Sequence, residues 1–272
     1  MSDQRVTSKG ALRRLFLSLL CCASTACLQA AGPCLPEALD ETEVAVSWNQ
    51  DGDTIKLEDG RRVRLIGIDT PELAKNNKPS QPFASRARQQ LRDLLEAGDM
   101  VVSLRYGEDR HDRYGRLLAH VISGEGATAS NLNARMVEDG MAVAITVPPN
   151  DRLAECYLDL EAGAREAERG IWSHARYQPV ASSQLLRQGT GFRIIEARID
   201  EVTEKRKGIW LHDLPLQVYI ARRDLEAFDA GWLRSLQGER VRVRGWVKKD
   251  RYSPAVKRFM MLRHPTAIEI ID

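Results

Sequence analysis

Apolar and polar residues alternate along two neighbouring stretches of the chain, Thr54–Leu57 and Arg61–Ile68. Alternation with a period of two is typical of β-strands that bury one face. An Asp-Gly pair at residues 59–60 separates the stretches, and this pair favours the tight turn of a hairpin. The sequence therefore predicts an antiparallel hairpin, preceded by a further extended segment at Val44–Trp48.

Three later stretches carry apolar residues at the three- and four-residue spacing of helices. The predicted helices span residues 79–97, 130–139 and 151–169, and a glycine follows each or lies just beyond it. Ser130 is the expected N-cap of the second helix. Strands are predicted at Met100–Tyr106 and Arg116–Ser123. Strands with helices inserted between and after them indicate a small, mainly β, α+β barrel over residues 40–173.

A Gln-, Ser- and Pro-containing stretch at residues 174–190 is predicted to be a linker, and a second strand-rich domain is expected at 191–272. A short helical piece is predicted at Arg222–Phe228. The expected strands are Phe192–Val202, Ile209–His212, Gln217–Ile220, Arg240–Lys248, and Phe259–Leu262 or Ile268–Ile271. Five short strands with one helix favour a second small OB-like β-barrel.

The N-terminus has the pattern of a secretory signal peptide over residues 1–30. Basic residues between positions 5 and 14 precede the apolar run Leu15–Cys22, and small residues follow up to Ala30–Ala31. We therefore expect export to the periplasm or the medium. A lipoprotein cut before Cys27 is a weaker alternative, as are a buried helix and an uncleaved anchor. The apolar run is too short for a stable membrane span.

Removal of residues 1–30 would leave 36 basic and 37 acidic residues, a net charge of −1. Any binding of nucleic acid must then come from local clusters of basic residues. The same cut leaves two cysteines, Cys34 and Cys156. Two cysteines in an exported chain suggest one disulfide, although a free Cys34 and a buried Cys156 are the alternative. So few soft ligands make a zinc site an unfavourable interpretation.

Two acidic turns lie at the hairpin, Asp51–Thr54 and Asp69–Glu72. Pairing across the hairpin can place Asp53 and Asp69 at the same end of the sheet. Carboxylates together with backbone carbonyls form the hard oxygen shell that Ca²⁺ or Mg²⁺ prefers. Each turn taken alone is also compatible with an ordinary polar connection.

Arg64 raises a geometric condition. Along a straight strand Arg64 and Asp69 lie on opposite faces, so one site can use both only if the strand curls or ends early. Pro71 makes an early end plausible, because proline offers no donor to a strand ladder. A third cluster, Arg113–Arg116, presents arginines suited to a phosphate, although an ordinary exposed turn is the alternative.

Four motifs occur in order along the chain: DGDT at residues 51–54, VRLIGIDTPE at 63–72, DRYGR at 112–116 and GIW at 170–172. In this combination the chain resembles the staphylococcal-nuclease-like (thermonuclease) family between Asp51 and Trp172. The resemblance implies an OB-fold barrel with three helices. It further implies a Ca²⁺ site formed by Asp53, Asp69 and the carbonyl of Thr70.

The same resemblance implies that Glu72 acts as general base or orients the attacking water, while Arg64 and Arg116 hold the phosphodiester. The implied enzyme is a calcium-dependent, sugar-nonspecific endonuclease that leaves 3′-phosphate ends on DNA and RNA. A cation and two arginines suit the charge that develops on a phosphoryl group under attack by water. We expect a monomer that prefers single strands.

Four further residues near these motifs are candidates for substrate binding: Lys75, Lys78, Arg113 and Tyr114. For the two lysines a merely solvated loop is an equal alternative. The family's nucleotide-contacting tyrosines are absent, because the matching stretch at residues 144–149 reads AITVPP. Base preference can therefore differ from that of the family.

The C-terminal stretch RVRVRGWVKK, residues 240–249, alternates an apolar face with a basic face. It resembles an OB-type module appended to some exported nucleases of this family. Arg242, Arg244 and Trp246 would form a platform for single-stranded nucleic acid, whereas a solvated strand face is the equal alternative. Two rival functions stay open: an inactive nuclease-like protein that binds nucleic acid, and a structural envelope protein.

Overall fold

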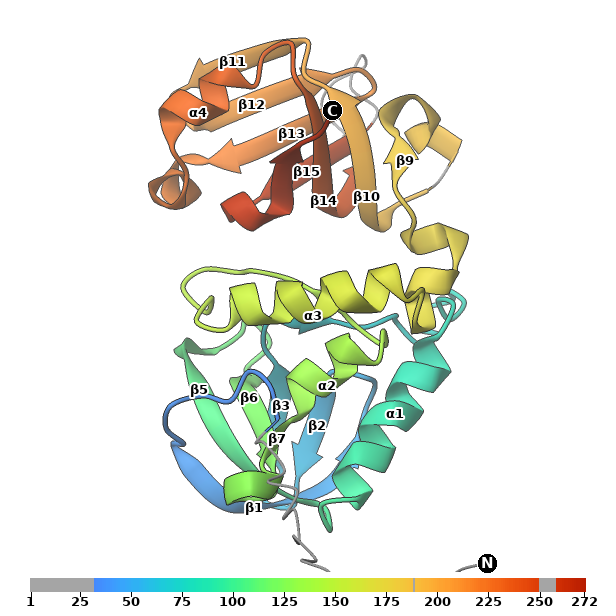
Figure 1. Cartoon of the computed structure of the whole chain (residues 1–272), viewed down its shortest axis with the longest axis vertical. Coiled ribbons are helices and arrows are strands. Elements are labelled where there is room, and N and C mark those ends of the chain that lie inside the picture. Colours follow the sequence, from blue (N-terminus) through green and yellow to red (C-terminus); the bar gives the residue numbers. More distant parts are fainter. Residues whose placement is uncertain (1–31, 188, 250–257) are drawn as a thin grey trace, which may run out of the picture.

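The computed structural model describes residues 32–187, 189–249 and 258–272. The expected signal peptide and Cys27 lie outside these residues. The chain forms two domains stacked end to end, with α3 (Ala154–Glu166) lying along the face of the first domain that meets the second (Figure 1). Within the described ranges no helix is long and apolar enough to cross a membrane.

The first domain contains eight strands and three α-helices among the described residues. Its strands are β1 (Glu41–Asn49), β2 (Thr54–Leu57), β3 (Arg62–Leu65), β4 (Ile68–Asp69), β5 (Val101–His111), β6 (Leu117–Ser123), β7 (Ser130–Asn131) and β8 (Val143–Ala144). Its α-helices are α1 (Ala84–Glu96), α2 (Leu132–Glu138) and α3, with 3₁₀ turns at Gly126–Thr128 and Gly170–Ser173.

A closed barrel of five strands forms the centre of this domain. The strand order is β3-β2-β1-β5-β6, and a parallel pairing of β3 with β6 closes the circle. The predicted hairpin pairs Thr54 with Arg64 and Lys56 with Arg62. The expected barrel with three helices is therefore confirmed.

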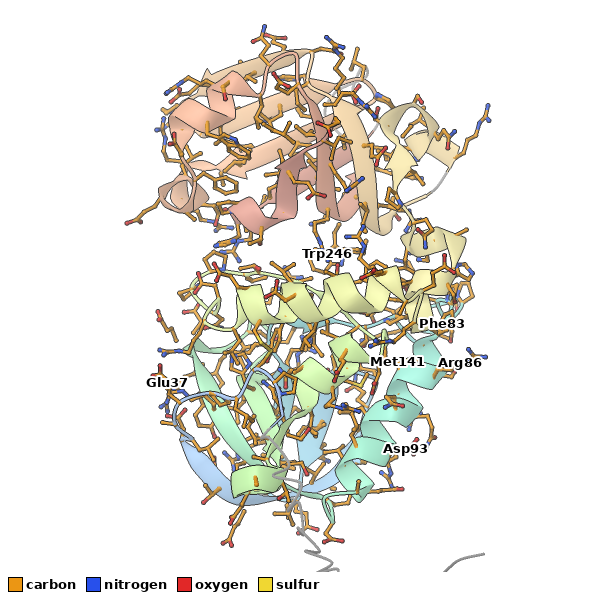
Figure 2. The ribbon with its side chains drawn as sticks, in the orientation of Figure 1. Glu37, Phe83, Arg86, Asp93, Met141 and Trp246 are labelled. Carbon is orange, nitrogen blue, oxygen red and sulfur yellow. A yellow bond between two sulfur atoms is a disulfide. The ribbon has the colours of Figure 1, made fainter. Side chains whose placement is uncertain are left out.

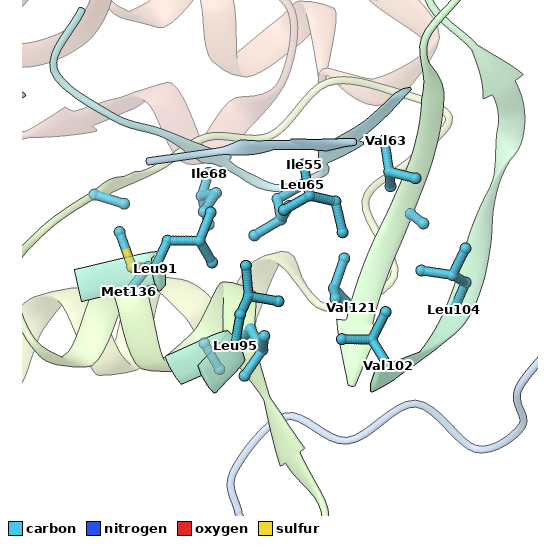
Figure 3. Packing of buried hydrophobic residues seen from close by; sticks show 14 of the residues in the cluster. Ile55, Val63, Leu65, Ile68, Leu91, Leu95, Val102, Leu104, Val121 and Met136 are labelled. Carbon is cyan, nitrogen blue, oxygen red and sulfur yellow. The ribbon is translucent and has the colours of Figure 1, made fainter. Parts of the chain in front are cut away.

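The barrel core is filled from both the strands and the helices. Leu91 and Leu95 of α1 lie against Leu65 and Ile68, and all four side chains are fully buried (Figure 3). These helical residues are four apart, so they share the face that the periodicity predicted. Burial of such leucine and isoleucine side chains stabilises a fold by about 1.5–3 kcal/mol each.

Boundaries differ from prediction in all three helices, and α3 spans Ala154–Glu166 rather than residues 151–169. α1 begins at Ala84, later than expected, because Phe83 adopts a left-handed backbone with φ 70°. The N-cap of α2 is Asn131 rather than Ser130. The Asn131 side chain accepts a hydrogen bond from the Ala134 amide, which is the capping contact expected of an N-cap residue.

The second domain is a curled sheet. Its described strands are β9 (Val180–Ala181), β10 (Gly191–Arg198), β11 (Glu201–Lys205), β12 (Gly208–Asp213), β13 (Leu216–Ala221), β14 (Arg240–Lys249), β15 (Arg258–Leu262) and β16 (Ile268–Ile270). The sheet order is β11-β12-β13-β15-β14-β10-β9, with β16 beside β14. Short 3₁₀ helices occur at Arg222–Ala227 and Pro265–Ala267. The helix α4 (Ala230–Ser235) was not predicted, although Asp229 caps it through the amides of Gly231 and Trp232.

The stretch expected as a linker has structure of its own. It contains 3₁₀ turns at Ala175–Tyr177 and Ser182–Arg187, and strand β9 pairs in parallel with β10. Tyr177 and Leu185 are buried. Tyr177 belongs to an apolar cluster that also holds Trp172 of the first domain and Phe192 of the second, so the two domains share buried surface.

Candidate active site

A sharp turn after β3 brings Arg64 and Asp69 together. β3 ends at Leu65, and the chain turns through Gly67, whose φ is +78°, before β4 begins at Ile68. A Cβ atom at Gly67 would lie 2.6 Å from Cε2 of Tyr157 in α3, so both the backbone angle and the close packing require glycine. The turn satisfies the condition that Arg64 and Asp69 must leave the alternation of a straight strand.

Arg64 lies between two carboxylates in the barrel. Its Nη2 lies 3.0 Å from Oδ1 of Asp69, and its Nη1 lies 3.2 Å from Oδ2 of Asp53. The Arg64 side chain is only 13% exposed. Nη1 also donates to the carbonyl oxygen of Leu65 at 2.8 Å. The guanidinium is therefore fixed in place before any substrate binds, which lowers the entropic cost of using it.

Asp53 connects the turn before β2 to the end of β4. Its Oδ2 accepts hydrogen bonds from the Thr70 amide at 2.9 Å and from Thr70 Oγ1 at 2.8 Å. The Thr54 hydroxyl donates to Asp53 Oδ1 at 3.2 Å. Gly52 permits this contact, because a Cβ atom there would lie 2.9 Å from the Thr70 side chain. Asp53 thus lies beside Thr70 at the end of the strand that carries Asp69, and the hairpin pairing predicted this closeness for the two aspartates.

Arg116 reaches the same place from the β5–β6 connection. Its Nη1 donates to the Thr54 hydroxyl at 3.2 Å, and its Nη2 lies 2.7 Å from Oδ2 of Asp112. The Asp112 carboxylate also accepts the backbone amides of Tyr114 and Arg116, so it holds the whole turn. Burial favours a higher pKa for Asp112, but the hydrogen bonds from Arg116 and Tyr114 together outweigh it and hold that pKa below its usual value. Asp112 was missed by sequence reasoning, and its signal is the first letter of DRYGR.

Burial and neighbouring carboxylates raise the pKa of two carboxyl groups in the site, those of Asp69 and Asp51. Burial raises the pKa of Asp69 to about 8, and the charges of Asp53, Glu72 and Asp51 add to this rise while Arg64 opposes it. Burial and the neighbouring Asp53 also raise the pKa of Asp51, to about 6. Asp51 is the first residue of the DGDT motif, and the sequence predicted no role for it. The negative charges of these carboxylates repel one another, and a bound cation would reduce that repulsion.

The donor set fits a hard divalent cation. Asp53 and Asp69 offer carboxylate oxygens beside the Thr70 main chain, and carboxylate and carbonyl oxygens are the ligands that Ca²⁺ and Mg²⁺ prefer. Among the described residues no group of three or more His, Cys, Asp and Glu side chains is arranged to hold a metal. A set of two carboxylates completed by a carbonyl and water is consistent with that finding.

Glu72 and the two predicted lysines lie on the exposed segment that follows β4. The Glu72 carbonyl accepts the Gln81 amide, and the Glu72 side chain is solvent-exposed yet close enough to act on the pKa of Asp69. Lys75 and Lys78 exchange backbone hydrogen bonds at 3.2 and 3.0 Å, and both side chains are exposed. The segment begins at the candidate metal ligands and extends into solvent.

Arg113 and Tyr114 lie at the exposed tip of the β5–β6 turn. The Tyr114 side chain is 62% exposed, and the guanidinium groups of Arg113 and Arg116 lie 4.8 and 5.7 Å from its ring centre. Cations at this distance from a ring are attracted by its negative face. The turn therefore gathers two arginines and one aromatic ring at the edge of the site.

The three C-terminal candidates lie in the other domain and differ from one another. Arg242 pairs with Glu196 and Glu269 at 2.8 Å each. Trp246 is 37% exposed at the junction of the two domains (Figure 2). Arg244 does not face open solvent, because its guanidinium contacts α3 of the first domain.

Arg244 forms a buried ion pair across the domain junction. Its Nη1 and Nη2 lie 2.6 Å from the two carboxylate oxygens of Glu161, whose side chain is 1% exposed. Nη2 also donates to the Ala144 carbonyl at 2.9 Å, and Glu161 accepts the Ala144 amide at 2.7 Å. This contact fixes the second domain on the first. Sequence reasoning missed Glu161, which lies 83 residues from Arg244 and carries no local signal.

Cys34 and Cys156 form a disulfide in the structure. The bond ties the segment before β1 to α3, whose Tyr157 side chain packs on Gly67. The bond therefore holds α3 close to the turn that positions Arg64 and Asp69.

Several known proteins are similar in sequence to the first domain of this chain. Residues 62–174 match the family model described as "Staphylococcal nuclease homologue". The chain is 37% identical over 125 residues to a thermonuclease of Staphylococcus intermedius, covering 45% of this chain and 71% of that protein. It is 35% identical over 127 residues to a thermonuclease of Staphylococcus hyicus, covering 46% and 72%. It is 33% identical over 131 residues to the endonuclease YncB of Bacillus subtilis (strain 168), covering 47% and 60%. With more than two thirds of each staphylococcal protein matched, this chain belongs to the staphylococcal nuclease family.

Proposed function

We propose that this chain is a calcium-dependent, sugar-nonspecific endonuclease that hydrolyses DNA and RNA to 3′-phosphate products. A nuclease that acts on nucleic acid is what family membership supports. The single observation that carries the finer proposal is the assembly of Arg64, Asp53, Asp69, Thr70 and Arg116 at one end of the barrel. A protein that only binds nucleic acid has little need of this set together with Glu72.

The residues have separate roles in this proposal. Asp53, Asp69 and the Thr70 carbonyl would hold Ca²⁺, which when bound stabilises negative charge on the phosphoryl oxygens. Arg64 and Arg116 donate hydrogen bonds to the same oxygens, whose charge grows in the transition state. Their guanidinium groups are already held by carboxylates in the structure, so they need little reorganisation.

Glu72 is the proposed general base. Its exposed carboxylate lies beside the candidate metal ligands and can accept a proton from a water that attacks phosphorus. The new P–O bond forms as the bond from phosphorus to the 5′ oxygen breaks, and that oxygen takes up a proton. The products are a 3′-phosphate and a 5′-hydroxyl. None of these contacts reads a base, which agrees with a nonspecific enzyme.

The test compares the chain lacking residues 1–30 with its Glu72→Gln variant on single-stranded DNA and RNA. We expect cleavage that requires Ca²⁺, stops with a chelator, and falls by about 10²–10⁴-fold in Glu72→Gln. Glu58→Gln is a matched control, because Glu58 is exposed at the hairpin turn away from the site. Binding without cleavage in every condition would instead support the inactive nuclease-like protein.

We also propose that residues 1–30 direct export and are removed, and that the mature protein is a monomer. The basic start, short apolar run and small-residue exit of this segment support the first proposal. N-terminal sequencing of the protein recovered from the periplasm or the medium tests cleavage near Ala30, and a start at a lipid-modified Cys27 would contradict it. Light scattering of the purified protein tests the monomer.

A further inference from the structure

A cleft of about 1110 Å³ lies at the junction of the two domains. The first domain contributes residues 144–147, from the end of β8 onward, together with Lys78 and Arg113. The second domain contributes the start of β10, residues 244–249 of β14 and the end of β15. Trp246 marks the position of this cleft in Figure 2. Sites for drug-sized ligands are roughly 300–1000 Å³, so this cleft has room for more than one small unit.

The charged side chains that line the described part of the cleft are all basic. Among the described residues that line it, six are lysine or arginine and none is aspartate or glutamate. Arg244 and Arg263 are neutralised by Glu161 and Asp224 behind the surface. In the described part of the chain the remaining four, Lys78, Arg113, Lys248 and Lys249, form no ion pair with a carboxylate. An unneutralised basic cleft in a protein with no overall positive charge after export favours an anionic ligand.

The cleft also offers an aromatic surface. Trp246 is 37% exposed, and its ring meets Phe192 edge to face with ring centres 5.8 Å apart. Met261, 36% exposed, lines the same cleft. A rigidly held tryptophan beside lysines is the combination that binds single-stranded nucleic acid, because an unpaired base stacks on the ring while phosphates meet the cations.

Two residues that line the cleft come from segments that also carry residues of the candidate active site. Arg113 lies in the same turn as Arg116, which reaches Thr54 beside Asp53. Lys78 lies on the exposed segment that begins at Glu72. The turn that carries a phosphate-holding arginine therefore also supplies a cation to the cleft.

We propose that this cleft binds the part of a single-stranded nucleic acid that extends beyond the scissile phosphate. A base stacks on Trp246, and the phosphates contact Lys248, Lys249 and Arg113. The inference rests on the proposed function for the position of the scissile phosphate. A duplex keeps its bases stacked inside and cannot offer them to Trp246, so the second domain selects single strands and increases affinity for long ones.

The experiment measures binding of a fluorescein-labelled 20-nucleotide single-stranded DNA by anisotropy, with chelator present so that no cleavage occurs. The cleft variant is Trp246→Ala combined with Lys248→Ala and Lys249→Ala. The matched control is Arg206→Ala with Lys207→Ala, which removes two exposed charges from the β11–β12 turn. Both variants should unfold at the same urea concentration as the wild type, since the altered side chains are partly or fully exposed.

We expect the cleft variant to bind the 20-mer about 5- to 100-fold more weakly, since one stacked base and two phosphate contacts are lost. The slope of log affinity against log salt should become shallower by about 1.4, or 0.7 per lost contact. With Ca²⁺, KM for the 20-mer should rise while KM for a dinucleotide stays unchanged. Duplex DNA should bind the cleft variant and the wild type alike.

Equal affinity of the cleft variant and the control for the 20-mer would overturn the inference. This result is distinct from failure of the proposed function. If the wild type cleaves nothing while the cleft variant still loses affinity for the 20-mer, the nuclease proposal fails and the cleft remains a single-strand site. If cleavage of the dinucleotide and the 20-mer is unaffected by the cleft substitutions, the nuclease proposal stands and the cleft inference fails.

Discussion

The buried pair of Arg244 and Glu161 should carry much of the attachment between the two domains. Replacement of Arg244 by Met removes both 2.6 Å contacts and leaves the Glu161 carboxylate 1% exposed. The Ala144 amide, 2.7 Å away, would be the remaining described donor to that carboxylate. Breaking a buried pair by removing one partner typically costs about 3–5 kcal/mol, because the other charge stays buried without compensation.

We expect Arg244→Met to lower the free energy of unfolding by about 3 kcal/mol or more in urea titrations followed by tryptophan fluorescence. Glu161→Gln should cost less, because Arg244 is 14% exposed and retains some contact with water. The double variant should be more stable than the sum of the single effects predicts, by about 2 kcal/mol, because neither charge is then left alone.

The matched control is Arg242→Met on the same strand. Arg242 pairs with Glu196 and Glu269, but its side chain is 29% exposed and theirs are 32% and 58% exposed. Exposed pairs of this kind contribute about 0–1 kcal/mol. If Arg244→Met costs no more than Arg242→Met, or if the single effects simply add in the double variant, the pair does not hold the domains as described.

Three further results are expected. Gly67→Ala should destabilise the fold by about 2 kcal/mol or more and abolish cleavage. The reason is that φ is +78° and the new methyl group would lie 2.6 Å from the Tyr157 ring. A normal urea midpoint with full activity would contradict this. The double variant Cys34→Ser/Cys156→Ser should lower the free energy of unfolding by about 3–5 kcal/mol, since the disulfide closes a loop of 122 residues. A urea midpoint equal to that of the oxidised wild type would argue against a stabilising disulfide. Burial, followed by two nearby arginines, lowers the pKa of His120 to about 4. Below about pH 6.5 the imidazole of His120 therefore binds a proton in the unfolded chain but stays neutral in the folded chain. The free energy of unfolding should fall by about 2 kcal/mol between pH 7 and pH 5. A His120→Gln variant should lack this part of the pH dependence. Equal slopes of the free energy of unfolding against pH for the variant and the wild type would refute this role of His120.

Local sequence was enough to predict the parts of the site that depend on the hairpin. The Asp-Gly turn determines the register that pairs Thr54 with Arg64, and that register brings Asp53 to the end of the strand that leads to Asp69. The turn residues and the alternation lie within a short stretch, so no distant contact is needed to infer them. The DRYGR turn is equally local, since Asp112 holds Arg116 four residues away.

Contacts between distant segments could not be predicted in the same way. The turn at Gly67 depends on the ring of Tyr157, which α3 brings from 90 residues further along the chain. Arg244 appeared to belong to an exposed face because alternation reports only which side of a strand a residue occupies. What covers that side depends on how the domains pack, and here Glu161 of the first domain covers it.

The disulfide gives the molecule a covalent ring. Cys34 and Cys156 enclose every residue proposed to bind the metal, hold the phosphate or accept the proton, from Asp53 to Arg116. A protease that cuts once at an exposed loop inside this ring, such as the segment around Lys75 and Lys78, releases no fragment, because both pieces stay joined through sulfur. A nicked molecule would run as one species on a gel until a reductant is added. Outside the cell, where proteases are abundant and thiols scarce, this connection would let a damaged enzyme keep its parts in place.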